Sequence, residues 1–480
     1  MQSAQASSSE KLAPGVWKVV LVVLLGPFMT SLDSTVVNVS MSTLASELHS
    51  TIGDTQWIIS GYLLALALML PLSGWLVDRV GAKRIYIGCF TAFTIASVLC
   101  GVAQNMGQLI FFRVLQGMAG GLLAPMAQMM IARIAGRQLA RVMGYSVMPI
   151  LLAPILGPVI AGAVLQSLNW RWLFYLNLPI GVLALALAVV LLPSDEENIF
   201  QRPFDLPGFL LLSPGLALLL YGLENTAHQY GRCCLVGSVP LLAAFLLYAK
   251  RKGKTALIDI ALFREPVFLT ASITQFFSNG VTFAGQMLTP LFLISGCHLS
   301  AAQTGLLVAP TGLGMMVSYP LMGFLTEKFG CRAVSAGGAL LALLATLPFI
   351  WMAQYEMIPS VLAVTLFFRG MGLGAINIPS MSAAYASVTK EKLAIATTAI
   401  NIVQRLGGPI ATTLAALILE SSGGMSSSTT TSHSFVVAFI FLSALQVVDM
   451  ISACFLPVRV QYRSGDQGES KLQAMEALTD

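Results

Sequence analysis

The sequence predicts an all-α integral membrane protein with fourteen transmembrane helices, arranged as two related six-helix bundles with two further helices inserted between them. Three observations predict this fold: 56% of the 480 residues are apolar and only 10% are charged, long apolar stretches recur, and the first part of the chain is echoed in its last part. A soluble globular chain carries roughly 25% charged residues. The composition therefore excludes a soluble enzyme, a nucleic-acid-binding module and a disordered chain.

Fourteen stretches are apolar and long enough to cross the hydrocarbon core of a bilayer, which takes about 20 helical residues. Continuous apolar runs such as 182–192 lack the two-residue alternation of a membrane β-barrel, so each stretch is predicted to be a helix. The predicted spans are residues 16–42, 55–77, 84–104, 107–132, 138–166, 171–192, 206–223, 231–250, 266–295, 301–326, 332–354, 358–388, 392–420 and 434–457.

The lysines and arginines predict the orientation of these spans. With the N-terminus in the cytoplasm and the loops alternating, 21 of the 26 fall in cytoplasmic segments. Two (Arg171 and Arg232) fall in outside loops, and three (Arg113, Arg369 and Arg405) fall within spans. A miscounted span would move every later loop to the other side and destroy this bias. We therefore expect both termini in the cytoplasm.

Cysteines and histidines do not form a recognisable site. The seven cysteines lie mostly inside apolar stretches without CxxC spacing and the four histidines are scattered, so we expect free thiols, no metal site and no cofactor. The sequence has no HExxH or GxxxxGK[ST] motif and no loop long enough for a catalytic domain, so we expect that this protein is not an enzyme. A polytopic membrane enzyme or sensor is the less favoured alternative, and the internal duplication disfavours a channel.

The chain repeats itself at a nearly constant offset. Residues 74–84 (GWLVDRVGAKR) are echoed by 323–332 (GFLTEKFGCR), and the Phe-Phe-Arg of 111–113 recurs at 367–369. Two six-span halves around a shared cavity are the architecture of a secondary transporter. The predicted units are a cytoplasmic N-terminal tail (1–15), an N-terminal six-helix bundle (16–192), a linker with two extra transmembrane helices (193–265), a C-terminal six-helix bundle (266–457) and a cytoplasmic tail (458–480).

Five short motifs resemble those of one transporter family. Residues 74–84 match the signature G-x-L-x-D-R-x-G-x-K-R of the major facilitator superfamily, and 113–117 (RVLQG) look like its fourth-span signature. Three more motifs are similar to those of its fourteen-span drug:proton antiporters: 32–39 (LDSTVVNV), 157–162 (GPVIAG) and 169–181 (NWRWLFYLNLPIG).

This resemblance implies the superfamily fold, a place in the cell inner membrane, and export of small amphipathic or drug-like compounds in exchange for protons, as in multidrug efflux and antibiotic resistance. The partners it implies are a small-molecule substrate, protons and the lipid bilayer, with no nucleic acid. The alternative is a proton-coupled transporter of one metabolite or siderophore. No segment looks like an oligomerisation device, so we expect a monomer.

Asp33 is the leading candidate for proton coupling, because it sits midway along the first predicted span without a basic residue nearby in the sequence. An ionised carboxylate at the centre of a span costs about 2.5–3.5 kcal/mol on insertion scales, so burial makes the protonated form accessible. We predict Arg113 as its partner, since the resembled family is thought to use this arginine to assist proton transfer. Asp449, in the last span, is a second protonatable candidate. The alternative is that Asp33 and Arg113 are structural struts.

The loop at 74–84 is predicted to be an inner gate as well as a topology signal. Gly74 permits close helix contact, Gly81 allows a turn that a Cβ would obstruct, and the charged residues can pair with neighbouring span ends. The predicted gating residues are Gly74, Asp78, Arg79, Gly81, Lys83 and Arg84. The alternative is that the positive charges only set the topology.

In the fifth span, Gly157, Pro158 and Gly162 predict a thin helix surface and a bend. Local flexibility at the interface between the halves is the functional interpretation. Plain close packing is the alternative, and the two can hold together.

Overall fold

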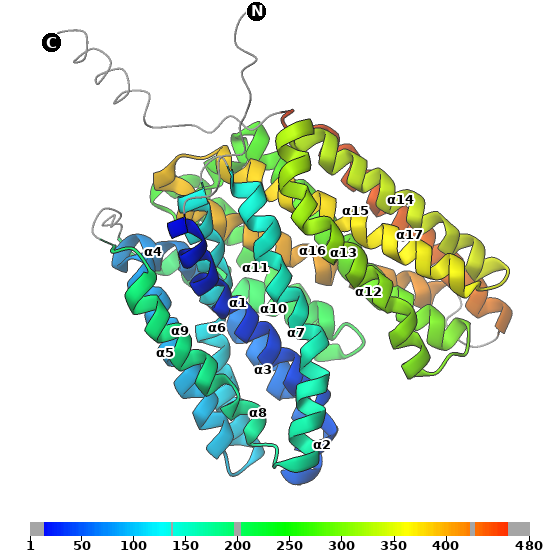
Figure 1. Cartoon of the computed structure of the whole chain (residues 1–480), viewed down its shortest axis with the longest axis horizontal. Coiled ribbons are helices and arrows are strands. Elements are labelled where there is room, and N and C mark those ends of the chain that lie inside the picture. Colours follow the sequence, from blue (N-terminus) through cyan, green and yellow to red (C-terminus); the bar gives the residue numbers. More distant parts are fainter. Residues whose placement is uncertain (1–13, 136–137, 196–202, 423–427, 459–480) are drawn as a thin grey trace, which may run out of the picture.

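The computed structural model describes residues 14–135, 138–195, 203–422 and 428–458 of the chain (Figure 1). Within these ranges every regular element is a helix, which confirms the predicted all-α fold. The predicted tails, 1–15 and 458–480, lie almost wholly outside the described residues.

The first part of the chain folds into α1 to α9, whose ends lie within a few residues of the predicted spans. The second span is broken at Pro71, which cannot donate the backbone hydrogen bond of a continuing helix, so α3 and α4 are joined by a 3-10 turn, Leu70–Leu72. The bounds are α1 Pro14–Val39, α2 Met41–Glu47, α3 Ile52–Met69, α4 Ser73–Val80, α5 Ala82–Val102, α6 Met106–Ala135, α7 Leu139–Ser167, α8 Trp172–Tyr175 and α9 Asn177–Leu191.

The inserted pair and the second half make up the rest. A short π-helical turn, Phe292–Gly296, extends α12, and α13 begins with a capping box in which Ser300 and Gln303 satisfy each other's backbone N–H groups. The bounds are α10 Leu206–Glu224, α11 Gln229–Lys252, α12 Pro266–Leu291, α13 Ala301–Phe329, α14 Cys331–Gln354, α15 Pro359–Ala386, α16 Leu393–Ser421 and α17 Ser428–Cys454.

Thirteen helical segments of the described ranges are long and apolar enough to cross a membrane. The ninth predicted span, α12, has the length, 26 residues, but is more polar than these segments. Its Thr274, Gln275 and Ser278 are buried, and the Gln275 amide donates to Ser380 Oγ (2.9 Å) and to the carbonyl of Asn377 (2.8 Å) on α15. The polar side of α12 is thus turned to the protein interior. With α12, the helices match the fourteen predicted spans.

The helices form two groups, α1 to α9 and α12 to α17 (Figure 1). In the first, α6 packs on α3 and α5, and α1 packs on α7 and α9. In the second, α15 packs on α13 and α14, and α12 packs on α16 and α17. Helix packing therefore repeats in the same order as the sequence motifs. Of the inserted pair, α10 packs on α11 and also contacts α3 and α16, one helix of each group.

The two groups meet at the end that carries α4. The hydroxyls of Ser73 and Thr398 lie 2.8 Å apart, and a Cβ on Gly74 would lie 2.9 Å from the Thr398 hydroxyl. Nearby, the Asn401 amide of α16 donates to Gln128 Oε1 of α6 at 2.8 Å. These polar contacts join α16 to both α4 and α6.

A second contact joins α7 to α13 at this same end, where α6 ends and α7 begins. A Cβ on Gly144 would lie 2.3 Å from the carbonyl oxygen of Tyr319, and one on Gly323 would lie 2.3 Å from Cα of Arg141. Backbones approach this closely only where glycine leaves the space. The two contacts together close this end of the molecule.

Candidate functional site

Asp33 lies in the second half of α1, which ends at Val39, and its carboxylate is buried (2% exposed). Arg113 of α6 lies against it, with Nη1 2.5 Å from Oδ2. The structure thus brings together the two residues that the sequence analysis paired. Because taking two charges out of water is unfavourable unless hydrogen bonds satisfy them, the other partners of this pair decide how well it is held.

Three further side chains complete a polar network. The amides of Gln116 and Asn177 donate to Asp33 Oδ1 at 3.1 and 2.7 Å, and Gln116 Oε1 accepts from Arg113 Nη1 at 2.7 Å. Asn177 Nδ2 also donates to Ser97 Oγ at 2.9 Å. All five residues are buried and come from α1, α5, α6 and α9. Asp33, Ser97, Arg113, Gln116 and Asn177 are called the polar network below.

Arg113 has contacts beyond the network. Its Nε donates to the carbonyl of Ile58 at 3.3 Å, and its guanidinium lies over the ring of Tyr62, 4.2 Å from the centroid. Arginine remains charged when buried, and a cation over an aromatic face is favourable. The network can therefore hold an ionised Asp33 fully hydrogen-bonded. Protonation of Asp33 would replace an acceptor by a donor and remove the charge that attracts Arg113.

Sequence reasoning missed part of this network. Gln116 and Asn177 stand within quoted motifs but were given no role, while Ser97 and Tyr62 were not singled out. The available signal was a polar side chain inside an apolar span. The sequence does not indicate that these side chains, up to 144 residues apart, converge on one carboxylate.

Asp449 lies apart from the polar network, on α17 in the second group of helices. It is buried (1% exposed), and neither carboxylate oxygen has a hydrogen-bond partner in the part of the chain that the structure describes. None of the hydrogen bonds of Asp33 involves it. The structure therefore does not join the two predicted protonatable residues into one site.

The predicted gating residues divide into two sets. Gly74 and Asp78 are buried on α4, where Gly74 touches α16 and Asp78 lines a small pocket together with Ile395 of α16. Arg79 and Arg84 are exposed. The buried pair thus faces the other group of helices, while the two arginines face away from the interior.

The turn after α4 is held by a residue that the sequence analysis did not select. Gly81 has φ +102°, and a Cβ there would lie 2.3 Å from Cγ of Asp195. Asp195 accepts from the backbone amides of Lys83 (2.9 Å) and Arg84 (3.0 Å), at the positive end of α5. The Lys83 ammonium donates to the carbonyl of Leu192 at 2.8 Å. These contacts tie the turn to the end of α9.

In α7, the three motif residues have different surroundings. A Cβ on Gly157 would lie 2.5 Å from Cγ2 of Thr35, so this glycine lets α7 approach α1. No atom lies within 4 Å of the position that a Cβ on Gly162 would take, and Pro158 is exposed. The close packing predicted for this motif is therefore found at Gly157 and not at Gly162.

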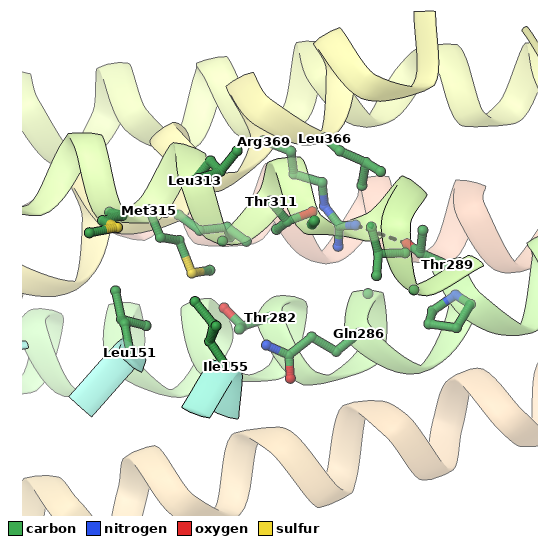
Figure 2. Close-up of a pocket in the computed structure, with 18 of the residues that line it drawn as sticks. Leu151, Ile155, Thr282, Gln286, Thr289, Thr311, Leu313, Met315, Leu366 and Arg369 are labelled. Carbon is green, nitrogen blue, oxygen red and sulfur yellow. Dashed lines mark hydrogen bonds between the residues drawn. The ribbon is translucent and has the colours of Figure 1, made fainter. Parts of the chain in front are cut away.

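A cavity of about 620 Å³ lies between α7 of the first group and α12, α13 and α15 of the second (Figure 2). Its size is that of pockets for drug-sized molecules, which have volumes of about 300–1,000 Å³. The wall is mostly apolar, and the few polar side chains come mainly from α12. The labelled apolar residues are Leu151, Ile155, Leu313, Met315 and Leu366, and the polar ones are Thr282, Gln286, Thr289, Thr311 and Arg369.

The cavity lies beyond the contact that closes the α4 end. On α7, Leu151 and Ile155 follow Gly144, and on α13, Leu313 precedes Tyr319. Because Gly144 and Tyr319 are in contact, both helices leave that contact in the direction of the cavity. The described arrangement is therefore closed at the α4 end, with a cavity between the two groups farther along.

Comparisons with known proteins agree with this architecture. Relatives include the multidrug resistance protein B homolog of Mycobacterium tuberculosis, 32% identical over 95% of this chain and 93% of the relative. Another is the putative multidrug resistance protein MdtD of Salmonella heidelberg, 30% identical over 83% of this chain and 85% of the relative.

Solved structures with the same fold include the human organic anion transporter MFSD10 and the proton:xylose symporter XylE. The TM-scores are 0.64 and 0.63 at 15% and 13% identity. The match covers 92% of this chain and 100% of MFSD10, and 91% of this chain and 94% of XylE. These likenesses concern the fold alone.

The family model described as Major Facilitator Superfamily matches residues 23–412. This match runs from α1 into α16, across the first group of helices, the inserted pair and most of the second group, and it confirms the family that the motifs resemble. The members of this family are secondary transporters, so the expectation that the chain is not an enzyme holds. On these grounds, the chain belongs to the Major Facilitator Superfamily and is a multi-pass membrane transporter.

Proposed function

We propose that this transporter exports small amphipathic compounds in exchange for protons, by alternating access of a site between its two halves. The observation that carries the proposal is the buried pair of Asp33 and Arg113 inside a membrane-spanning bundle. Ionisable residues within spans characteristically mark proton relays and ion pathways. The relatives named as multidrug resistance proteins support the drug-like class of substrate.

Asp33 couples proton entry to substrate export because its carboxylate cannot be protonated and fully paired with Arg113 at the same time. In its ionised form it accepts from Arg113, Gln116 and Asn177. A proton on the carboxylate removes the charge that attracts Arg113, which weakens the link between α1 and α6. One proton moving down a potential of 100 mV releases about 2.3 kcal/mol, which can drive export against a gradient. Asp449 is a second candidate carrier.

The 74–84 loop serves as the inner gate. Gly74 and Asp78 hold α4 against α16, and the turn at Gly81 is anchored to α9 through Lys83. With the loop on the cytoplasmic side, a closed α4 end and a cavity beyond it describe the outward-facing state. Arg79 and Arg84 then contribute to orientation by the positive-inside rule.

Further expectations about topology, assembly and motion belong to the same proposal. Both termini lie in the cytoplasm, the membrane is the cell inner membrane, and the working unit is a monomer. Residues 16–192 and 266–457 rock against each other as two bundles, with residues 193–265 between them. Gly157 and Pro158 of α7 provide the local flexibility at this interface, with Gly162 as the third residue of the motif.

The decisive experiment measures transport in proteoliposomes with an imposed pH gradient. Asp33→Asn mimics the protonated carboxyl and cannot release a proton, so we expect loss of gradient-driven accumulation with retained downhill exchange. Substrate-induced proton release, followed with a pH-sensitive dye, should also be lost. A panel of drug-like dyes and single metabolites tests breadth, because a narrow metabolite transporter would move only one class.

The matched control is Asp54→Asn. Asp54 is an exposed carboxylate in the first turn of α3, where it accepts from Thr51 at 2.7 Å, and it is not part of the polar network. Transport by this variant should equal that of the wild type. If Asp33→Asn still accumulates substrate at the wild-type rate, Asp33 is a strut and the proton path runs elsewhere.

A further inference from the structure

We infer that the cavity between α7, α12, α13 and α15 binds amphipathic organic anions, and that Arg369 holds their carboxylate. This inference rests on the proposed transport of amphipathic compounds and names their class. Arg369 of α15 is buried (3% exposed) and forms part of the cavity wall, where it points toward α12 (Figure 2).

Arg369 is poorly satisfied by the protein. Its Nη1 donates to Thr289 Oγ1 at 3.3 Å and its Nη2 to the carbonyl of Val281 at 3.4 Å, both at the long end for such bonds. Its Nε has no partner, and no carboxylate lies within 4 Å, among the residues that the structure describes. A guanidinium has five N–H donors, and a buried charge without a counter-ion is unfavourable. A ligand with a negative group would supply what is missing.

The first half of the chain shows how such an arginine is satisfied from within. Arg113 bonds to Asp33, which precedes it by 80 residues, and Arg369 bonds to Thr289, which also precedes it by 80 residues. At this spacing Arg369 therefore has a neutral threonine hydroxyl as its hydrogen-bond partner, where Arg113 has a carboxylate. Gln116, three residues after Arg113, has Gly372 as its counterpart. The second half retains the arginine, while the two side chains that satisfy its equivalent are missing.

The surroundings hold the guanidinium at the cavity wall and leave space for a ligand. A Cβ on Gly285 would lie 1.5 Å from Nη2, so the guanidinium rests directly on the bare backbone of α12. Leu151 and Ile155 of α7 and Met315 of α13 present apolar surface to the same space. Arginine binds carboxylates in a planar, two-bond geometry. This combination suits a drug-sized molecule with an apolar body and one carboxylate.

Binding can be tested without any gradient. The probes are dansylglycine, which carries a carboxylate, and dansylglycinamide, its neutral match, titrated by fluorescence into the full-length protein in phosphatidylcholine nanodiscs. The wild type should bind the carboxylate more tightly than the amide. Because a hydrogen bond to a charged group contributes about 1.5–3 kcal/mol, Arg369→Gln should weaken binding of the carboxylate at least about tenfold and leave the amide unchanged.

A second variant supplies the missing carboxylate inside the protein. Thr289→Asp places an acid 80 residues before Arg369, as in the first half, and should remove the preference for dansylglycine while the apolar cavity still binds the amide. Arg405→Gln is the control, because Arg405 lies on α16 and outside the cavity wall. It should keep the preference.

Several results would overturn the inference: equal affinity of the wild type for both probes, or loss of the preference in Arg405→Gln but not in Arg369→Gln. A third result would also overturn the inference: both probes bind equally well in phosphatidylcholine, and phosphatidylglycerol abolishes the binding of both. Arg369 would then bind a lipid phosphate. The proposed function is tested separately. If the wild type prefers the carboxylate probe but shows no gradient-driven transport, the proposal of proton-coupled export is wrong and the anion site stands. If it transports substrate but shows no preference for the carboxylate, the anion site is wrong and the proposed function stands.

Discussion

The two halves of this transporter keep the same helix packing but treat their buried arginines in opposite ways. Arg113 in the first half meets Asp33 at 2.5 Å and lies over the ring of Tyr62 at 4.2 Å. Arg369 in the second half has two long hydrogen bonds to neutral groups, and the ring of Phe349 lies 6.0 Å away. One arginine is neutralised within the protein, and the other faces a cavity.

In contrast, the turn after the second span of each half is built alike. Gly81 and Gly330 have φ of +102° and +85°, and each turn bonds to the end of the last span of its own half. Lys83 donates to the carbonyl of Leu192 at 2.8 Å, and Arg332 Nε donates to the carbonyl of Leu456 at 2.7 Å. We call each set of contacts a turn anchor.

The duplication has preserved some features of the bundle and not others. Turn anchors serve the shape of a six-helix bundle, so both halves need them. The environment of the buried arginine differs instead: in the first half the arginine is paired with a buried carboxylate, and in the second half it has only neutral hydrogen-bond partners among the described residues. If the proposed roles hold, the proton binds beside Arg113 in the first half, and the substrate binds beside Arg369, its counterpart in the second half.

The largest effect is expected from removal of Arg113, and removal of Arg369 provides the comparison. Arg113→Met leaves Asp33 buried without its counter-ion, and breaking a buried pair in this way destabilises by about 3–5 kcal/mol. Arg369→Met removes a buried charge that has no carboxylate partner among the described residues, so it should be neutral or stabilising. Thermal unfolding in detergent, followed by fluorescence-detected size exclusion, compares the two variants.

The double variant Asp33→Asn with Arg113→Met serves as the control, because it removes both charges of the pair. It should recover most of the stability lost in Arg113→Met. If Arg369→Met lowers the unfolding midpoint as much as Arg113→Met does, the two arginines are equally well satisfied within the protein, and the difference between the halves does not hold.

The turn anchors should give a smaller and equal effect. Gly81→Ala and Gly330→Ala each place a Cβ where φ is positive, which costs about 1–2 kcal/mol for an L-residue. In addition, a Cβ on Gly81 would collide with the side chain of Asp195, and one on Gly330 would collide with the carbonyl oxygen of Val458. Both variants should therefore unfold at lower temperature than the wild type, by similar amounts.

Gly88→Ala on α5 is the matched control for these turns. Apart from its chain neighbours and the backbone of its own helix, no described atom lies within 4 Å of its added Cβ, and alanine favours a helix over glycine by up to about 1 kcal/mol. It should unfold at the wild-type temperature or above. If Gly330→Ala is as stable as this control, the turn anchor stabilises the first half alone.

The spans could be predicted from local signals in the sequence, whereas the pairing of Asp33 with Arg113 also depended on the family resemblance. Apolar length marks a helix in a bilayer, and a charge within a span demands a partner. Asp195 could not be predicted in the same way, because its role depends on two chain segments, more than 100 residues apart, meeting at the start of α5. Arg369 was noted as an echo of Arg113, but only the structure shows that Thr289 stands opposite it.

The smallest effect concerns the inserted helices, which have a polar anchor of their own. Asp205 caps α10 by accepting from the amide of Gly208 (3.1 Å), and it also accepts from Leu257 N (2.8 Å), Tyr248 Oη (2.7 Å) and Lys252 Nζ (2.6 Å). Burial alone raises the pKa of the Asp205 carboxyl, but these hydrogen bonds outweigh it and hold that pKa below its ordinary value. The carboxylate therefore stabilises the folded state only where it is ionised.

The pH dependence of this anchor follows from the sign of that shift. A carboxyl whose pKa falls on folding stabilises the protein fully above its unfolded pKa, about 4, and this contribution is lost as the pH falls through the lower, folded value. Asp205→Asn should unfold below the wild-type temperature at pH 7, and the gap should shrink as the pH is lowered from 5 toward 3. A gap that stays constant with pH would mean that the asparagine disturbs packing rather than charge. Because Asp205 binds only residues of the linker and the inserted helices in the described contacts, transport by this variant at pH 7 should change less than in either arginine variant.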